Sequence, residues 1–240
     1  LGLRLDHYKK YDGYVWTPSS YKRHEDASYT ELSPKLVLEY FPDPKTTLYA
    51  SFGHSFNPPR LYQLYSEPAY GYHGNPALTP EKSNTFEFGG KKQFDDRTYL
   101  GLSFYHAKTT DMIGVSAPDA AGNRHYINLN RTKKVGGEIE LRHNFSHAWS
   151  AFVNYNYERA TDGDGDRIYY IPQHTLHLGV KYDKKPWSAY LEGQYISSRN
   201  EPDEFSGHYL SDDAFFIANC GINYQFMKNA TLSLTVENLF

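Results

Sequence analysis

The feature that most constrains this chain is a period-two alternation of apolar and polar residues that continues over long segments. In "RTYLGLSFYH" (97–106), Leu100, Leu102 and Phe104 fall on one face, and Gly101 and Ser103 fall on the other. The same alternation occurs in "HTLHLGVKY" (174–182), "WSAYLEGQY" (187–195) and "ATLSLTVENLF" (230–240). A period of two is typical of β-strands, and no segment sustains the 3.6-residue period of a helix. The pattern therefore predicts an all-β chain.

Eleven segments follow this pattern, and we expect them to be strands. They lie near residues 1–11, 32–41, 46–56, 83–94, 97–111, 125–144, 148–159, 168–182, 187–198, 213–226 and 230–240. Several contain ten residues or more, whereas strands of soluble proteins usually contain about five or six. Long strands of this kind favour a structure that has to cross a thick layer.

Two kinds of connection alternate between these strands. Short turns lie at 42–45, 95–96, 146–147, 183–186 and 227–229, and long polar loops lie at about 12–31, 57–82, 112–124, 160–167 and 199–212. Each short turn follows an aromatic residue, namely Phe41, Phe94, Phe145, Tyr182 or Phe226. Short turns at one end, long loops at the other and aromatic residues at the interface are typical of an antiparallel transmembrane β-barrel. Tyrosines near strand ends are interpreted as interface residues, namely Tyr8, Tyr49, Tyr155, Tyr182 and Tyr195.

The composition agrees with a β-barrel and argues against a helical membrane protein. Aromatic residues make up 17% of the chain, with 23 tyrosines. No apolar run approaches the roughly 18 residues that a transmembrane helix needs, and the mean hydropathy is -0.71. Barrel strands alternate in polarity, so a barrel is hydrophilic on average.

A soluble β-sandwich is the alternative fold, because its strands also alternate. The polar faces of the predicted strands, however, carry Glu138, Glu140, Arg142, Asn154 and Glu158. These side chains could not pack against a second apolar sheet, whereas in a barrel they would line a water-filled lumen. Eleven strands would leave two unpaired edges in lipid, so we expect the remaining strands to come from sequence outside this chain.

Charge and motif content give no support for an enzyme. The net charge of -3 indicates no nucleic-acid partner, and the single Cys220 excludes an internal disulfide framework. No Gly-x-Ser-x-Gly sequence, phosphate-binding loop or helical His-x-x-x-His motif is present. His174 and His177 would lie on opposite faces of a strand and could not share a metal ion. An outer-membrane enzyme on a smaller barrel stays an open alternative.

Alternating carboxylates occur in Asp162-Gly163-Asp164-Gly165-Asp166. Oxygen ligands in such an arrangement can suit calcium. The segment lacks the downstream glutamate of an EF-hand, because it runs directly into "RIYYIP". A solvated loop tip is the simpler interpretation, and the sequence leaves calcium binding open.

Several motifs in their order and spacing resemble the C-terminal half of the barrel of TonB-dependent outer-membrane receptors. The resemblance covers residues 1–240 and is carried by Ser33-Pro34-Lys35, Phe56-Asn57-Pro58-Pro59, Asn75-Pro76, Leu78 through Glu81, Gly136-Gly137-Glu138 and Asn238-Leu239-Phe240. One departure is Asn57, where arginine is more usual in the family. The resemblance implies about 11 of about 22 barrel strands. It also implies that the plug and the closing strand lie outside this sequence, which would form one partial barrel domain (1–240).

The resemblance implies active uptake of a scarce nutrient, such as a ferric siderophore, cobalamin or haem, across the outer membrane of a Gram-negative bacterium. The implied partners are outer-membrane lipid, the TonB–ExbB–ExbD system through an N-terminal plug, and a small metal chelate as cargo. The receptor would be a monomer without catalytic residues, a resident cofactor or a metal site. A passive, porin-like barrel is the chief alternative, and a secreted β-rich binding module is the second.

The long loop between Phe56 and the strand that begins near 83 is predicted to lie outside the cell, over the mouth of the lumen. Its prolines interrupt the strand ladder because proline has no amide hydrogen to donate. Tyrosine is a rigid, amphipathic contact residue. We therefore expect five residues of this loop to contact the cargo: Tyr62, Tyr65, Tyr70, Tyr72 and His73. A histidine here is similar to haem receptors of the family, whereas the segment Tyr72-His73-Gly74-Asn75-Pro76 is also similar to cobalamin receptors.

Overall fold

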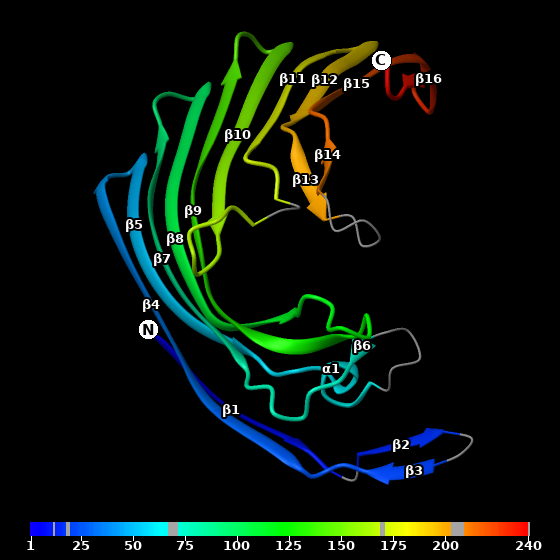
Figure 1. Ribbon diagram of the computed structural model, residues 1–240. Helices are drawn as coiled ribbons and strands as arrows, with labels where there is room; N and C mark the ends of the chain where they lie inside the picture. The colour runs from blue at the N-terminus through cyan, green and yellow to red at the C-terminus, as the bar shows by residue number, and fades with distance from the viewer. Residues whose placement is uncertain (12, 18–19, 67–71, 169–170, 203–208, 240) are drawn as a thin grey trace.

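Eleven antiparallel strands form one curved sheet in the computed structural model of this chain (Figure 1). The structure describes residues 1–11, 13–17, 20–66, 72–168, 171–202 and 209–239. Neighbouring strands of the sheet follow one another along the chain, and β1 and β16 form its two edges. The strands are β1 (Gly2–Lys10), β4 (Ala27–Asp43), β5 (Thr46–Asn57), β7 (Glu81–Gln93), β8 (Thr98–Val115), β9 (Arg124–Asn144), β10 (Trp149–Thr161), β11 (His174–Lys184), β12 (Trp187–Ile196), β15 (Phe215–Met227) and β16 (Ala230–Val236).

The remaining elements are short and lie in segments that the sequence predicts as long loops. β2 (Tyr14–Thr17) and β3 (Ser20–Arg23) form one hairpin, and β13 (Arg199–Pro202) and β14 (Tyr209–Asp212) form a second. Between β5 and β7 lie the helix α1 (Leu61–Tyr65) and the strand β6 (Tyr72–His73). Such elements escape sequence reasoning because they are too short for a period to emerge.

All eleven predicted strands are present, although several ends differ from the predicted ranges. β4 begins five residues early, at Ala27, and β8 continues to Val115. Two further differences have identifiable reasons. The strand predicted over 168–182 begins only at His174. The amide of Ile168 donates instead to the carbonyl oxygen of Ala160 (2.9 Å), so the chain folds back on β10 there. The last strand ends at Val236 and not at 240, because Asn238 has a φ of 54°. That conformation is outside the strand region, and asparagine tolerates it better than most residues.

The register confirms one apolar and one polar face. Leu102 and Ile139 are directly opposite one another, as are Phe104 and Gly137, and Phe88 stacks on Phe104 at 5.3 Å. Many apolar side chains on this face are exposed to solvent in the isolated chain. Among the described residues, the buried apolar side chains are few: Pro59, Leu64, Leu78, Ala160 and Ala218. The apolar residues of the sheet therefore cover its outside and do not form a central core.

The polar face is the concave one. A depression in this face is lined by the polar residues Glu138, Glu140, Asn154, Asn156, Thr175 and His177. On the same face, the Tyr105 hydroxyl donates to Glu158 Oε2 at 2.7 Å. The ring of Tyr105 also lies where a Cβ on Gly136 would project, which explains the first glycine of Gly136-Gly137-Glu138. This face matches the polar lumen expected for a barrel.

Aromatic residues gather near the short turns, as predicted. Trp149 contacts Tyr182 with ring centroids 4.9 Å apart, and Trp187 stacks on Tyr224 at 4.3 Å. The prediction for Tyr49 as an interface residue is wrong, because its hydroxyl donates to Glu87 Oε1 (2.7 Å) on the polar face. Tyr49 follows Leu48 in the alternation and therefore points the opposite way.

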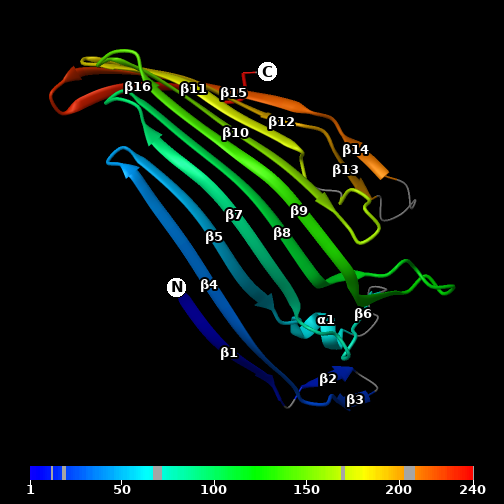
Figure 2. The same ribbon diagram turned by 90° about the vertical axis from the view of Figure 1, so that its left-hand side faces the viewer.

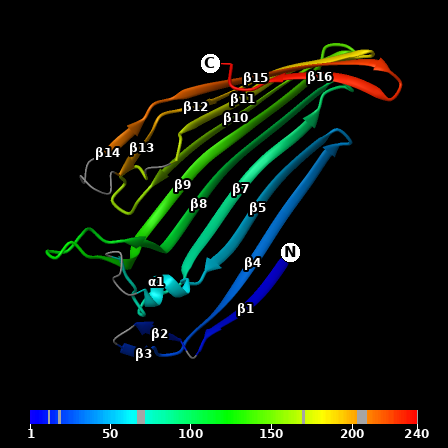
Figure 3. The ribbon, with the colours of Figure 1, turned by 90° about the vertical axis from the view of Figure 1, so that its right-hand side faces the viewer.

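The two ends of the sheet differ in their connections. Figures 2 and 3 show the short turns at one end, and α1, β6 and both small hairpins toward the other. This separation confirms the alternation of short and long connections that the sequence predicts. Among the residues that the structure describes, no helix has the length and apolarity needed to cross a membrane.

Candidate ligand-binding site at the long-loop end

The segment between β5 and β7 is an ordered structure built around α1. Pro58 and Pro59 end the ladder of β5, since neither can donate a backbone hydrogen bond. The amide of Arg60 donates to the side-chain oxygen of Gln63 (2.7 Å), which caps the start of the helix. Leu64 and Pro59 are completely buried, so apolar contacts anchor the helix.

Gly74 brings β6 against the end of α1. Its amide donates to the carbonyl oxygen of Ser66 at 2.9 Å, and the next amide, of Asn75, donates to Gln63 at 2.8 Å. A Cβ on Gly74 would lie only 2.5 Å from the backbone nitrogen of Ser66. Glycine is therefore required for this approach, and the Gly74-Asn75 pair acts as a clasp between helix and strand.

Two asparagines fasten this segment to the first residues of β9. The Asn75 amide group donates to the carbonyl oxygen of Tyr126 (3.0 Å). Asn128 accepts a hydrogen bond from the Thr79 amide at 2.9 Å and donates one to the Thr79 carbonyl oxygen at 3.0 Å. The loop predicted to cover the lumen is thus fixed to the outer part of the sheet at two points.

β6 pairs in parallel with the start of β9, with Tyr72 opposite Arg124 and His73 opposite His125. The two imidazole rings are stacked, with centroids 4.8 Å apart and planes inclined by 24°. Figure 1 shows α1 and β6 on the concave side of the sheet. The pairing therefore places aromatic side chains over the lumen.

Three tyrosines form a second aromatic group beside the histidine pair, and we call the two together the mouth cluster. Tyr126 contacts Tyr62 edge-on, with centroids 5.8 Å apart, and lies 6.4 Å from Tyr72. The mouth cluster consists of two separate contacts at this end of the sheet: the group of Tyr62, Tyr72 and Tyr126, and the pair of His73 and His125. Alternation along β6 and β9 places the tyrosine group and the histidine pair on opposite sides of the β6–β9 pairing. Aromatic rings with polar tips provide both apolar contact area and hydrogen-bonding groups for a ligand.

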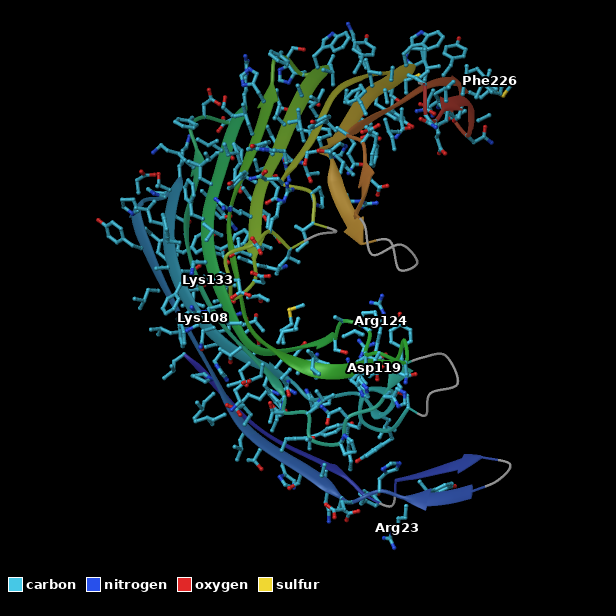
Figure 4. All side chains as sticks on the ribbon, viewed as in Figure 1. Arg23, Lys108, Asp119, Arg124, Lys133 and Phe226 are labelled. Carbon is cyan, nitrogen blue, oxygen red and sulfur yellow. The ribbon has the colours of Figure 1, made fainter. Side chains whose placement is uncertain are left out.

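A carboxylate borders the mouth cluster. Asp119 Oδ2 lies 3.5 Å from Nε2 of His125, and its other oxygen accepts the amides of Ala121 (2.8 Å) and Asn123 (2.9 Å). These hydrogen bonds, first from Asn123 and then from Ala121, hold the pKa of the Asp119 carboxyl below its usual value. Figure 4 shows Asp119 and Arg124 near β6 on the concave side. The carboxylate keeps its negative charge down to a lower pH than an ordinary aspartate.

His73 has a ring nitrogen without a partner in the described part of the chain. Its Nε2 atom is buried and makes no hydrogen bond there. Buried polar atoms are nearly always hydrogen-bonded, and leaving one unpaired is unfavourable. A polar group of a ligand could satisfy this atom.

Of the five residues predicted to contact cargo, the structure brings Tyr62 and Tyr72 together around Tyr126, and it places His73 in the adjacent histidine pair. Tyr62, Tyr72 and His73 belong to the mouth cluster. Tyr65 instead packs against His24 at 4.3 Å, and its hydroxyl donates to the Glu25 carbonyl oxygen at 3.3 Å. Burial, together with the charge of Asp26, raises the pKa of Tyr65. Tyr70 lies outside the described residues. Contact with cargo stays a prediction for all five.

Sequence reasoning missed His125, Tyr126 and Asp119. The sequence "NRHYIN" (123–128) carries a histidine–tyrosine pair at the start of a predicted strand. Nothing in it indicates a parallel pairing with residues 72–73, because that contact is set by how the long loop folds back. The pairing of His73 with His125 is therefore visible only in the structure.

Metal-binding groups do not converge in the described part of the chain, where no three His, Cys, Asp or Glu side chains could hold one ion. In the aspartate-rich loop, Asp162 Oδ1 accepts the amides of Asp164 (3.0 Å), Gly165 (3.0 Å) and Asp166 (2.9 Å). That carboxylate oxygen is used to hold its own turn.

Comparison with known proteins identifies the family. The family model described as "TonB dependent receptor-like, beta-barrel" matches residues 1–239. The chain belongs to the TonB-dependent receptor family. The resemblance seen in the sequence motifs is thereby confirmed, as is the fold as part of a TonB-dependent receptor barrel.

The names of curated relatives of this TonB-dependent receptor chain indicate different cargoes. The ferric-pyoverdine 358 receptor of Pseudomonas putida is 23% identical over 100% of the chain. The catecholate siderophore receptor Fiu of Escherichia coli K12 is 26% identical over 67% of the chain, and the vitamin B12 transporter BtuB of Vibrio cholerae is 22% identical over 88%. The chain spans 29%, 22% and 33% of these proteins. The relatives are receptors and transporters, not enzymes.

Solved structures of similar fold include two transporters of this kind. The copper transporter OprC has a TM-score of 0.80 at 21% identity, with 99% of this chain and 39% of OprC covered. The closed form of Fiu from E. coli K12 has a TM-score of 0.75 at 22% identity, with 99% and 37% covered. At these identities the likeness concerns the fold of the TonB-dependent receptor barrel.

Proposed function

We propose that this chain is part of an outer-membrane receptor of a Gram-negative bacterium that takes up a ferric siderophore by TonB-dependent transport. The full-length protein would be a monomer and would contact TonB through segments other than this one. The mouth cluster is the observation that carries the proposal, because it gathers tyrosines and histidines over the lumen at the long-loop end. The names of two relatives support a siderophore as cargo.

Siderophores are bulky chelates with many oxygen atoms, and the mouth cluster offers suitable contacts for them. Tyrosine hydroxyls can donate hydrogen bonds to chelate oxygens, and the rings can pack against aromatic or aliphatic parts of the ligand. The buried Nε2 of His73 could meet a polar group of the same ligand only after local movement of β6. No covalent step is needed, and the metal travels as cargo.

Haem is the second candidate cargo because His73 lies in the mouth cluster. Axial ligation of haem iron would need a ring nitrogen that can reach the metal. His73 Nε2 is buried and its ring is stacked on His125, so ligation would require β6 to leave β9. The observed arrangement supports contact with a chelate better than iron ligation.

The experiment measures uptake of ⁵⁵Fe-siderophore by cells whose only receptor is the full-length protein. Tyr62→Ala, Tyr72→Ala and His73→Ala are compared with Tyr40→Ala, a matched variant at an exposed position near a short turn. Loss of binding in the first three variants at equal outer-membrane levels would support the proposal. Uptake that persists without TonB would favour a passive channel. Uptake of haem or cobalamin, but of no siderophore, would show that the proposed cargo is wrong.

A further inference from the structure

The outward face of the sheet changes from apolar to basic toward the long-loop end. On β8, Leu102 and Phe104 are followed on the same face by Lys108. On β9, Ile139 and Val135 are followed on that face by Lys133. The described side chains in both series are exposed. The boundary between the apolar belt and the charged region therefore lies at the same level on the neighbouring strands β8 and β9.

Four exposed cations lie just beyond this boundary, and we call them the basic patch. They are Lys108, Arg131, Lys133 and Arg159. Lys108 is directly opposite Lys133, and Arg159 is opposite Val135 on the next strand pair. Since side chains of a strand alternate between faces, the register puts all four cations on the outward face. Figure 4 shows Lys108 and Lys133 close together on the sheet.

The basic patch lacks its own counter-charges. Within the described residues, none of its four cations forms an ion pair with a carboxylate. Two other lysines of the sheet do form ion pairs: Lys82 with Glu31 at 2.7 Å, and Lys134 with Glu158 at 3.1 Å. Like charges directly opposite one another destabilise a sheet. The Lys108–Lys133 pair is thus unfavourable unless an anion lies beside it.

We infer that the basic patch binds the phosphate groups of an anionic lipid in the outer leaflet of the outer membrane, that is, lipopolysaccharide. The inference rests on the proposed function, since it needs the barrel to lie in that membrane. Arginine and lysine both bind phosphate, and arginine does so through two parallel hydrogen bonds. The adjacent belt with Phe104 and Val135 would contact the acyl chains of the same molecule. Continuity of patch and belt favours a lipid over free phosphate.

The test uses the full-length receptor in detergent, titrated with purified lipopolysaccharide and with the same lipid after removal of its phosphates. The variant is Lys108→Gln combined with Lys133→Gln. We expect the affinity of this variant for the intact lipid to be lower than that of the wild type by roughly tenfold or more. The wild type should bind the dephosphorylated lipid as weakly as the variant binds the intact lipid.

The matched control removes the same charge from the concave face. Lys35 and Lys91 are opposite Gly53 and Gly101 on that face, so Lys35→Gln with Lys91→Gln should leave lipid binding unchanged. An equal loss in this control would overturn the inference, because binding would then depend on net charge alone. Inorganic phosphate that binds wild type as tightly as the lipid does would also overturn it.

Fractionation separates this inference from the proposed function. If the wild-type protein is not recovered in outer membranes, the proposed function fails. If it is recovered there but the Lys108→Gln/Lys133→Gln variant binds lipopolysaccharide as wild type does, only the lipid site fails.

Discussion

The imidazole ring of His73 stacks on that of His125, with centroids 4.8 Å apart and planes inclined by 24°. The contact joins β6, inside the longest predicted loop, to the first residues of β9. Through it the loop gains a fixed position over the concave face, with Tyr62 and Tyr72 beside Tyr126. A loop of this kind would present a preformed surface to a ligand and avoid much of the entropic cost of ordering.

Substitutions at His73 should separate stacking from ligand contact. His73→Ala removes the ring and its nitrogens, whereas His73→Phe keeps a ring that can stack on His125. If stacking is the main role, we expect His73→Ala to weaken siderophore binding about fivefold, equivalent to roughly 1 kcal/mol, and His73→Phe to have a smaller effect. Binding of ⁵⁵Fe-siderophore to cells with the full-length receptor measures both. An equal loss in the two variants would show that a ring nitrogen contacts the cargo.

Gly74→Ala should release the loop from its clasp. The added Cβ would lie 2.5 Å from the Ser66 nitrogen and 2.6 Å from the Tyr65 nitrogen, so the backbone would have to move. We expect faster amide exchange and proteolysis in residues 72–80, with the sheet unchanged. Gly53→Ala is the matched control, because nothing lies within 4 Å of the Cβ it would add. Unchanged exchange in Gly74→Ala would contradict the assigned role of this glycine.

The fold could be predicted from the sequence because a barrel repeats one simple signal. Alternation identified eleven strands, and the sheet contains them in chain order. Sequence reasoning failed where a single backbone geometry decides the outcome. Asn238 ends β16 through its positive φ, and Ile168 bonds back to Ala160 in place of extending β11. Tyr49 was misassigned because tyrosine is compatible with either face of the sheet. Its place next to Leu48, which faces outward, is what puts the Tyr49 side chain on the concave face.

The candidate site was only partly predictable. Tyr62, Tyr72 and His73 could be selected because they are aromatic residues in a proline-bounded loop. Their partners Tyr126 and His125 come from a strand that the sequence assigns to the barrel wall. The contact depends on a two-residue parallel pairing, which leaves no periodic trace in the sequence. Long-range loop docking is therefore the part of this site that needs a structure.

The turn that carries Asp119 should loosen in acid. The pKa of this carboxyl is lowered in the folded state, mainly by the amides of Asn123 and Ala121. A group with a lowered folded pKa contributes stability that is present above its unfolded pKa, about 3.9 for aspartate. That contribution is lost as the pH falls through the lower folded value. We expect protection of the Asn123 amide, corrected for intrinsic exchange, to be constant from pH 7 to about pH 4 and to fall below that.

Asp119→Asn provides the control for this pH dependence. Its side-chain oxygen can still accept the amides of Ala121 and Asn123, but it does not titrate. Protection at Asn123 should therefore become independent of pH in this variant. A fall below pH 4 that persists unchanged would assign the effect to another carboxyl group.

Adjacent lysine substitutions on β8 should distinguish the two faces of the sheet. Leu102 is opposite Ile139 on the apolar face, and Ser103 is opposite Glu138 on the polar face. Leu102→Lys would place a charge against lipid, at a cost of roughly 2–4 kcal/mol near the middle of the bilayer. Ser103→Lys would place the same charge beside a carboxylate and should be nearly neutral. The measurement is urea unfolding of the full-length protein in lipid vesicles. The folded fraction is quantified on gels from the different migration of folded protein in samples that are not boiled. Equal destabilisation in both variants would refute the assignment of the faces, because only one of the two positions would meet lipid.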